Sequence, residues 1–474
     1  MRRFTLALPP VNIVDHEGII QSSRNELLHL AWPMLVAQLA VIGNGVIDTA
    51  MAGRLSTLDL AAVGVAASIQ VTIVMALSGI LFALPPIIAT HHGAQQSERV
   101  GHEVRQSLWI ALVLTVIAIL LLRYPEPFIA LADLQPTVEA KVRAYLDASA
   151  WGVPAALAFR LFIGFSTGIG QPRPVMLFNL LSLGLKVPLN AWFMYGGLGI
   201  PALGGPGCAV ASSVDAWLMA GLAWIWCLRQ TEYASYRLEL HLPRPDTPTL
   251  TAFLKLGIPI GLTFLADVTA FTFMALFIAR LGPTVSAAHQ IAANLAVLAF
   301  MVPLSLGNAT AILAGKALGA GNPAQARQVC LVGIRTGLSF GVGLSLLLWF
   351  SAEQIAALYS PDLEVRKVAV PLIWWVAGYH LCDALQVVAV NSLRGYRKST
   401  VPMIIYTVTL WGIGLGGGYI LGLTDLLGEA RGATGFWIAG AGSLAIVGLL
   451  VAYYLDAVSK EVIEIQDRQT LNTA

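Results

Sequence analysis

Three aspartates, Asp48, Asp267 and Asp383, lie deep inside apolar stretches of the sequence. An ionised carboxylate at the centre of a bilayer costs about 3 kcal/mol on insertion scales, so carboxylates there are rare and mark ion or substrate pathways. The alternative is that each carboxyl is protonated, or bonded to a neighbouring helix, and serves packing alone. The positions therefore make these three aspartates candidates for a functional site within the membrane.

Polar residues accompany these aspartates at helical spacing. Asn44 precedes Asp48 by one turn, and Tyr379 and Gln386 share a helix face with Asp383. These side chains are candidates to support the carboxylates or to line a cavity.

One lysine, Lys186, also stands within an apolar stretch. It shares a polar stripe, about 80° wide on a helix, with Asn179, Ser182 and Asn190. A buried lysine loses its proton or pairs with a carboxylate, and Asp48 is the candidate partner in the same half of the chain. The alternative, snorkelling to the membrane surface, is disfavoured because about ten residues of the stretch lie on either side of Lys186.

The composition tells us which elements carry these residues. The chain has 474 residues, 57% hydrophobic and only 11% charged, whereas soluble proteins carry about 25% charged residues. These fractions exclude a soluble globular chain and a disordered one. The net charge of +2 does not suggest a nucleic-acid partner, and four scattered cysteines without a CxxC pair predict neither disulfides nor a zinc site.

A membrane-crossing helix needs about 20 mainly apolar residues, and a barrel strand only about ten. The predicted fold is therefore an all-α polytopic membrane protein with twelve transmembrane helices. The predicted spans lie near residues 27–52, 59–89, 104–124, 138–169, 174–196, 206–228, 252–281, 284–315, 328–350, 366–393, 401–424 and 432–457.

The sequence also repeats itself. Leu30-Ala-Trp-Pro33 aligns with Leu256-Gly-Ile-Pro259 at an offset of 226, and the same offset pairs Arg54-Leu55 with Arg280-Leu281. Six spans separate the copies, so two six-helix lobes are expected, related by a pseudo-twofold axis along the membrane normal. A residue needed only for the fold should recur in both copies, but the positions equivalent to the three aspartates are apolar: Met274, Val41 and Leu157.

The predicted organisation is a cytoplasmic N-terminal tail, an amino-terminal lobe, a cytoplasmic linker, a carboxy-terminal lobe and a cytoplasmic C-terminal tail. Their predicted ranges are 1–26, 27–228, 229–251, 252–457 and 458–474. With both termini in the cytoplasm, about twice as many of the loop Lys and Arg residues fall on the inner side as on the outer side, which fits the positive-inside rule.

Several strings resemble the multidrug and toxic compound extrusion (MATE) family, in its NorM-like bacterial branch. They are Val46-Ile-Asp-Thr-Ala-Met-Ala-Gly53, Ala288-His-Gln-Ile-Ala-Ala-Asn294 and Gln386-Val-Val-Ala-Val-Asn-Ser-Leu-Arg-Gly-Tyr396. The similarity extends from about residue 25 to 457.

The resemblance implies a multi-pass protein of the bacterial inner membrane that exports cationic, amphiphilic drugs in exchange for H⁺ or Na⁺. By motif, Asp48 matches the coupling aspartate of the amino-terminal lobe, and Asp267 and Asp383 match the acidic pair of the carboxy-terminal lobe, which would hold Na⁺ in a sodium-coupled protein. The residues expected to line the cavity or support these sites are Asn44, Lys186, Asn190, Tyr379, Gln386 and Asn294.

The chain departs from that branch at two positions. The acid of the seventh span is usually Glu and is Asp267 here, and Lys186 replaces the first Asn of the fifth span while Asn190 is retained. Because an ammonium beside Asp48 would repel Na⁺, this departure favours H⁺ over Na⁺ as the coupling ion.

Two other functions fit the sequence less well than export of cations. A flippase for a lipid-linked sugar would need a cationic cavity for the pyrophosphate, whereas the buried charges are mainly acidic. An intramembrane enzyme would need paired catalytic residues, and the single His289 has no acid in its own span. We expect no enzyme activity, no cofactor beyond the coupling ion, no ATP hydrolysis and a functional monomer surrounded by membrane lipid.

Overall fold

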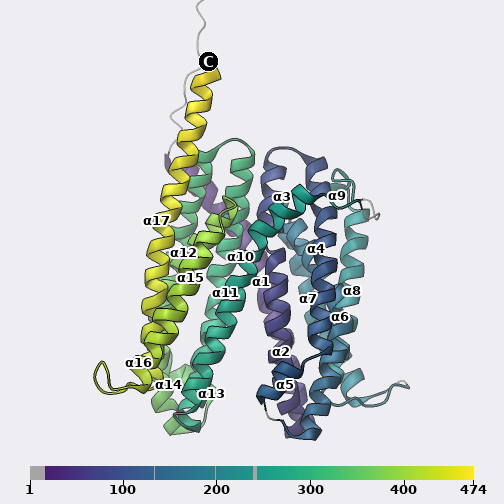
Figure 1. The fold of residues 1–474 in the computed structure, drawn as a ribbon, viewed down its shortest axis with the longest axis vertical. Helices are drawn as coiled ribbons and strands as arrows, with labels where there is room; N and C mark the ends of the chain where they lie inside the picture. The colour runs from purple at the N-terminus through teal and green to yellow at the C-terminus, as the bar shows by residue number, and fades with distance from the viewer. Residues whose placement is uncertain (1–15, 133, 198, 239–242, 474) are drawn as a thin grey trace, which may run out of the picture.

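The computed structural model describes residues 16–132, 134–197, 199–238 and 243–473. Twelve helical segments of the described chain are long and apolar enough to cross a membrane, which confirms the predicted fold class. Figure 1 shows them as two bundles side by side.

The first bundle contains the helices that precede the linker. Its elements are α1 (His16–Leu55), α2 (Thr57–Leu81), α3 (Leu84–Gly93), α4 (Ser97–Arg123), α5 (Glu126–Ala132), α6 (Pro136–Gly168), α7 (Pro172–Tyr195) and α8 (Gly207–Arg229). The second contains α10 (Thr247–Ala279), α11 (Pro283–Gly319), α12 (Pro323–Phe350), α13 (Ala352–Tyr359), α14 (Leu363–Gly395), α15 (Thr400–Thr409), the π-helical stretch η1 (Leu410–Gly416), α16 (Gly417–Leu423) and α17 (Ala433–Thr473).

The packing within the two bundles follows the sequence repeat. Helix α6 packs against α4 and α8 in the first bundle, as α14 packs against α12 and α17 in the second. Each bundle has its own apolar core. A third cluster joins them, with Leu30 and Met34 of α1 packed against Leu306 and Ile312 of α11.

The bundles meet closely where α3 crosses α11. A Cβ atom on Gly93 would lie 2.0 Å from the carbonyl oxygen of Lys316, and one on Gly319 would lie 1.8 Å from that of Thr90. The ion pair between Lys316 and Glu26 of α1, at 3.1 Å, lies at the same end, towards which the end of α17 extends (Figure 1). Only glycine permits this crossing, so the two bundles are in backbone contact at the end where α1 begins and α17 ends.

We expect Gly319→Ala to open this end. The added methyl cannot coexist with the carbonyl of Thr90, and overpacking of this kind costs about 1–3 kcal/mol. Double electron–electron resonance between spin labels at positions 99 and 324 should give a distance distribution that is longer and broader than that of the parent chain. Gly343→Ala is the matched control, because a Cβ there meets no atom within 4 Å, and its distribution should match that of the parent. An unchanged distribution for Gly319→Ala would show that the crossing tolerates a side chain.

Three predicted boundaries differ from the structure. The second span, predicted near 59–89, is one span over Thr57–Gly93, but a short turn between α2 and α3 interrupts its helix, and Pro85 and Pro86 lie in the first turn of α3. The tail expected over 1–26 is helical from His16, and residues 1–15 lie outside the described residues. The tail expected over 458–474 continues α17 to Thr473, where the i,i+4 pair of Asp456 and Lys460, at 2.6 Å, supports an exposed helix.

The linker expected over 229–251 packs on the first bundle. It contains the short helix α9 (Thr231–Ala234), and residues 239–242 lie outside the described residues. The Tyr233 hydroxyl lies 2.8 Å from Ser166 Oγ, and the Tyr236 hydroxyl lies 3.0 Å from His92 Nδ1. Burial raises the pKa of Tyr233 to about 12, so this tyrosine stays neutral and the linker is held by hydrogen bonds.

Candidate ion and substrate sites

The first candidate site lies within the amino-terminal bundle, between α1, α7 and α8. Lys186 Nζ lies 2.9 Å from Asp48 Oδ1, which confirms the predicted pairing, and Lys186 also donates to Ser212 Oγ. Asn190 Nδ2 donates to the same Asp48 oxygen at 2.7 Å. Only 2% of Lys186 is exposed. The ammonium therefore lies among oxygen atoms in the position that a bound cation would otherwise take.

A second carboxylate, Asp215, lies close to this pair. Ser182 Oγ donates to Asp215 Oδ2 at 2.6 Å, so Asp215 joins α7 to α8. Asn44 Nδ2 donates to Ser182 Oγ at 3.1 Å, so Asn44 supports the Ser182–Asp215 pair. Asp215 Oδ1 is buried and accepts no hydrogen bond from any described residue. This unpartnered oxygen makes Asp215 a candidate ligand for a cation.

The second candidate site lies in the carboxy-terminal bundle. Asp267 on α10 and Asp383 on α14 line one cavity of about 410 Å³, together with Tyr379 and Asn294. Tyr406 of α15 donates its hydroxyl proton to Asp267 Oδ1 at 2.6 Å. Among the described residues, nothing donates a hydrogen bond to Asp383, which is 4% exposed. One cavity is thus lined by four of the predicted site residues: Asp267, Asp383, Tyr379 and Asn294. It is also lined by Tyr406, which the sequence analysis did not predict.

Gln386 lies beside this cavity rather than in it. It lines a smaller cavity of about 40 Å³ with Asp267, Tyr406 and Arg394. In the part of the chain that the structure describes, no three His, Cys, Asp or Glu side chains are grouped to hold a metal ion. Carboxylate, amide and phenol oxygens are hard ligands. The arrangement can hold a proton, or a Na⁺ ion whose remaining ligands are amide or water oxygens.

Tyr406→Phe is expected to lower export about tenfold, because a hydrogen bond to a charged group contributes about 1.5–3 kcal/mol. The measurement is the initial rate of ethidium efflux from cells at matched expression. Tyr453→Phe is the matched control: Tyr453 lies on α17 of the same bundle, is 78% exposed, lines neither of these cavities and makes no hydrogen bond to a described residue. Equal losses in the two variants would show that the Tyr406–Asp267 bond has no particular role.

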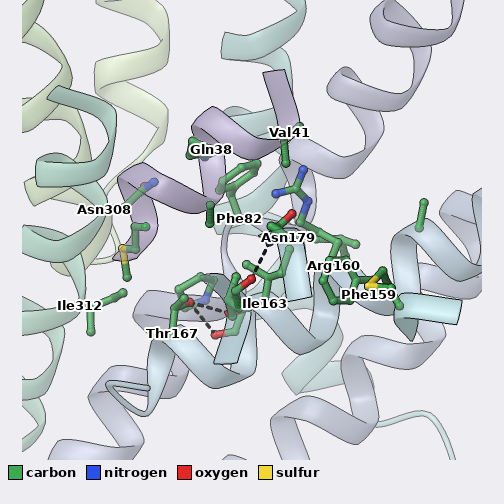
Figure 2. A pocket seen from close by; sticks show the side chains of 18 of the residues that line it. Gln38, Val41, Phe82, Phe159, Arg160, Ile163, Thr167, Asn179, Asn308 and Ile312 are labelled. Atoms are coloured by element: carbon green, nitrogen blue, oxygen red, sulfur yellow. Dashed lines mark hydrogen bonds between the residues drawn. The ribbon is translucent and has the colours of Figure 1, made fainter. Parts of the chain in front are cut away.

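A further cavity, of about 250 Å³, lies between the two bundles. Figure 2 shows Gln38, Arg160, Thr167 and Asn179 of the first bundle around it, opposite Asn308 of α11. Its remaining lining is mostly apolar, with Asp215 on one wall and Arg394 contributed by α14.

Two arginines of this cavity differ from what the sequence interpretation leads one to expect. A basic residue at the end of a span is expected at the aqueous surface, but Arg394 lies at the last turn of α14 and is only 6% exposed. Arg160 of α6 lines the cavity between the bundles. The buried charges are therefore not mainly acidic here, because two guanidinium groups and one carboxylate line this cavity.

The chain is similar to known proteins over most of its length. The sequence model of the MatE family matches residues 33–192 and 259–420. The chain is 37% identical over 440 residues to the "Probable multidrug resistance protein NorM" of Aromatoleum aromaticum, covering 92% of this chain and 94% of that protein. It is 38% identical over 419 residues to the "Multidrug resistance protein PmpM" of Pseudomonas aeruginosa, covering 88% of each.

Solved structures share the fold at lower identity. The eukaryotic MATE transporter AtDTX14 superposes with a TM-score of 0.85 at 17% identity, over 95% of this chain and 99% of that one. The Vibrio cholerae MATE transporter VcmN in its bent form gives 0.82 at 20% identity, over 94% and 99%. Their two-bundle architecture is the one described above.

Proposed function

We propose that this chain, which belongs to the MatE family of multidrug and toxic compound extrusion transporters, exports organic cations in exchange for an inward-moving H⁺ or Na⁺. The observation that carries the proposal is the cavity shared by the half-buried Asp267 and the buried Asp383, because two carboxylates in one space within the membrane can exchange a small ion for an organic cation. The names of the relatives, multidrug resistance proteins, support the same function. The chain is a transporter and not an enzyme.

The transport cycle is alternating access. The bundles are in backbone contact at the end where α1 begins and α17 ends, where Gly93 and Gly319 lie at the crossing of α3 and α11. Opening this contact while closing the opposite end would expose the central cavities to the other side. We place the termini in the cytoplasm of a bacterium, with the chain in its inner membrane, because this orientation satisfies the positive-inside rule. All the candidate sites are complete within one chain, which supports a functional monomer that needs no ATP and is surrounded by lipid.

The coupling ion is H⁺ in our proposal. In the amino-terminal bundle the ammonium of Lys186 already compensates Asp48, so a second cation there would meet its repulsion. Asp267 and Asp383 remain as the coupling pair. Binding of the ion drives the cycle only if the inward- and outward-open forms bind it with different affinities.

The test uses purified protein in proteoliposomes that contain ethidium. An imposed pH gradient without Na⁺ should drive ethidium transport, and addition of a Na⁺ gradient should leave the rate unchanged. Transport driven by a Na⁺ gradient in the absence of a pH gradient would show that the coupling ion is Na⁺ and not H⁺, with Asp267 and Asp383 as its ligands. Absence of transport under both gradients would contradict the proposed export function itself.

A further inference from the structure

A basic cavity of about 460 Å³ lies at the end of the molecule where α1 begins and α17 ends. Its basic side chains are Lys255 of α10 and the neighbours Arg397 and Lys398, which lie in the loop between α14 and α15. One acid, Glu103 of α4, lines it as well. Three cations thus face one carboxylate, in a space that shares no lining residue with the ion and substrate cavities described above.

The two lysines of this basic cavity have unused hydrogen-bond donors. In the described part of the chain, the ammonium of neither Lys255 nor Lys398 forms an ion pair or a hydrogen bond. Glu103 lies beside other cations, since its Oε1 is 3.6 Å from His91 Nε2, which in turn lies 3.5 Å from Arg397 Nη2. Two ammonium groups are therefore left for an anionic ligand.

The backbone at Arg397 adopts a conformation that favours glycine. Its φ of 57° lies in the left-handed region. The same turn, with the same pattern of backbone hydrogen bonds, follows α6, the helix that corresponds to α14 in the sequence repeat. There Gly170, with a φ of 83°, and Gln171 take the positions of Arg397 and Lys398. A glycine therefore meets the needs of the turn, which indicates that the two cations serve something other than the fold.

Exposed apolar side chains lead from the basic cavity along two neighbouring helices. On α10, the exposed Ile258 and Leu262 follow Lys255 at helical spacing. On α15, which packs against α10, the exposed Val401 and Ile404 follow the loop, and Val401 also lines the cavity. Apolar side chains exposed on a membrane-crossing helix face the hydrocarbon of the bilayer. The basic cavity thus opens onto a surface that acyl chains cover.

We propose that the basic cavity binds the phosphate group of an anionic phospholipid from the adjoining leaflet. Lys255, Arg397 and Lys398 surround the phosphate, and the acyl chains lie along the exposed apolar side chains of α10 and α15. Basic pockets between transmembrane helices on the cytoplasmic side suit such headgroups. A free phosphate ester would use the same cations, but only a lipid also covers the apolar side chains. The proposal goes beyond the export function and does not rest on it.

The test measures lipid binding to the purified full chain in detergent by native mass spectrometry. The probes are dioleoyl phosphatidylglycerol, with one net negative charge, and dioleoyl phosphatidylethanolamine, whose ammonium cancels that charge on the same acyl chains. The parent chain should bind phosphatidylglycerol more tightly. The double variant Lys255→Gln with Lys398→Gln should weaken this binding about 25-fold, because each basic residue near an anionic lipid surface contributes about fivefold.

The matched control is the double variant Arg99→Gln with Arg229→Gln. Both arginines are exposed at the same end of the molecule, on α4 and α8, and lie outside the basic cavity. Neither forms an ion pair or a hydrogen bond with a described residue. The control should bind phosphatidylglycerol as the parent does. Equal weakening in the two double variants would overturn the proposal, because the lipid would then respond only to the overall charge of the surface.

The single variants protect the test against a double variant that does not fold. Lys255→Gln and Lys398→Gln change exposed side chains, and each should weaken phosphatidylglycerol binding about fivefold. Parental affinity in both single variants would overturn the proposal.

Glycerol 3-phosphate distinguishes the lipid from a soluble anion. It carries a phosphate without acyl chains, so at millimolar concentration it should not displace bound phosphatidylglycerol. Displacement would overturn the lipid site, because the cavity would then hold a free phosphate ester. Equal affinity of the parent chain for the two lipids would overturn it as well, since the cations would not select charge. None of these outcomes depends on drug export, so the lipid site and the export function are tested separately.

Discussion

Asp383→Asn is expected to abolish drug export, with a loss of about a hundredfold, which lies in the upper part of the range for coupling between two binding sites. Asp383 is buried and no described residue donates a hydrogen bond to its carboxyl group. Its only charged neighbour within the shared cavity is Asp267, and two like charges there favour uptake of a cation. Asparagine preserves the shape and removes the charge, so the loss would report coupling rather than packing. The measurement is ethidium efflux from cells at matched protein levels.

The control for this substitution is Asp147→Asn. Asp147 lies on α6, and its side chain is 53% exposed and paired with Arg123 at 3.5 Å. Exposed pairs contribute about 0–1 kcal/mol, so this variant should export at the parental rate. If Asp383→Asn instead exports at the parental rate, Asp383 has no role in coupling, and Asp267 is the only carboxylate of this cavity left to bind the coupling ion.

Much of the fold follows from hydrophobic length and the internal repeat. The twelve spans were predictable because each needs about 20 apolar residues and the loops between them are short. The repeat of Leu30–Pro33 at Leu256–Pro259 predicts two bundles of the same topology. The break between α2 and α3 was not predicted, because the apolar run continues through Pro85 and Pro86 without a polar interruption.

The candidate sites were predictable only where partners share a helix or where charges pair in one bundle. Asp48 and Lys186 are such a pair, since each is a lone charge in an apolar helix. Tyr406 could not be found in this way: a tyrosine in an apolar span gives no sign of which helix it will face, and its bond to Asp267 spans 139 positions of sequence.

Arg394 shows a different limit. It lies at the end of its span, and sequence reasoning assigns such a residue to the aqueous surface. Its burial depends on close packing between α14 and α11: a Cβ on Gly395 would lie 2.8 Å from the Ala311 carbonyl oxygen, and one on Gly307 would lie 2.9 Å from Asn391 Nδ2. Such tight contacts between distant glycines and their neighbours are set by the tertiary fold, so neither burial nor the shared cavity could be predicted.

Lys186→Met is expected to destabilise the chain by about 3–5 kcal/mol, the range for removing one partner of a buried ion pair. The substitution would leave Asp48 in the membrane interior with Asn190 as its only hydrogen-bond donor among the described residues. Asp48→Asn should destabilise for the reciprocal reason, because Lys186 would keep only Ser212. The double variant Asp48→Asn with Lys186→Met buries no net charge and should be more stable than either single variant. Thermal unfolding of the purified proteins in one detergent measures all three.

The double variant also separates stability from transport. If the pair only compensates a costly charge, the double variant should fold and retain export driven by Asp267 and Asp383. If the pair opens and closes during the cycle, the double variant should fold and lose export, because a proton or a cationic substrate could no longer displace the ammonium from Asp48. Losses in stability that simply add would contradict the pairing itself, since residues in direct contact do not behave independently. We expect a stable protein with reduced export. Asn44 and Ser182 lie one helical turn before Asp48 and Lys186, and they form a chain of hydrogen bonds to Asp215, which lines the cavity between the bundles.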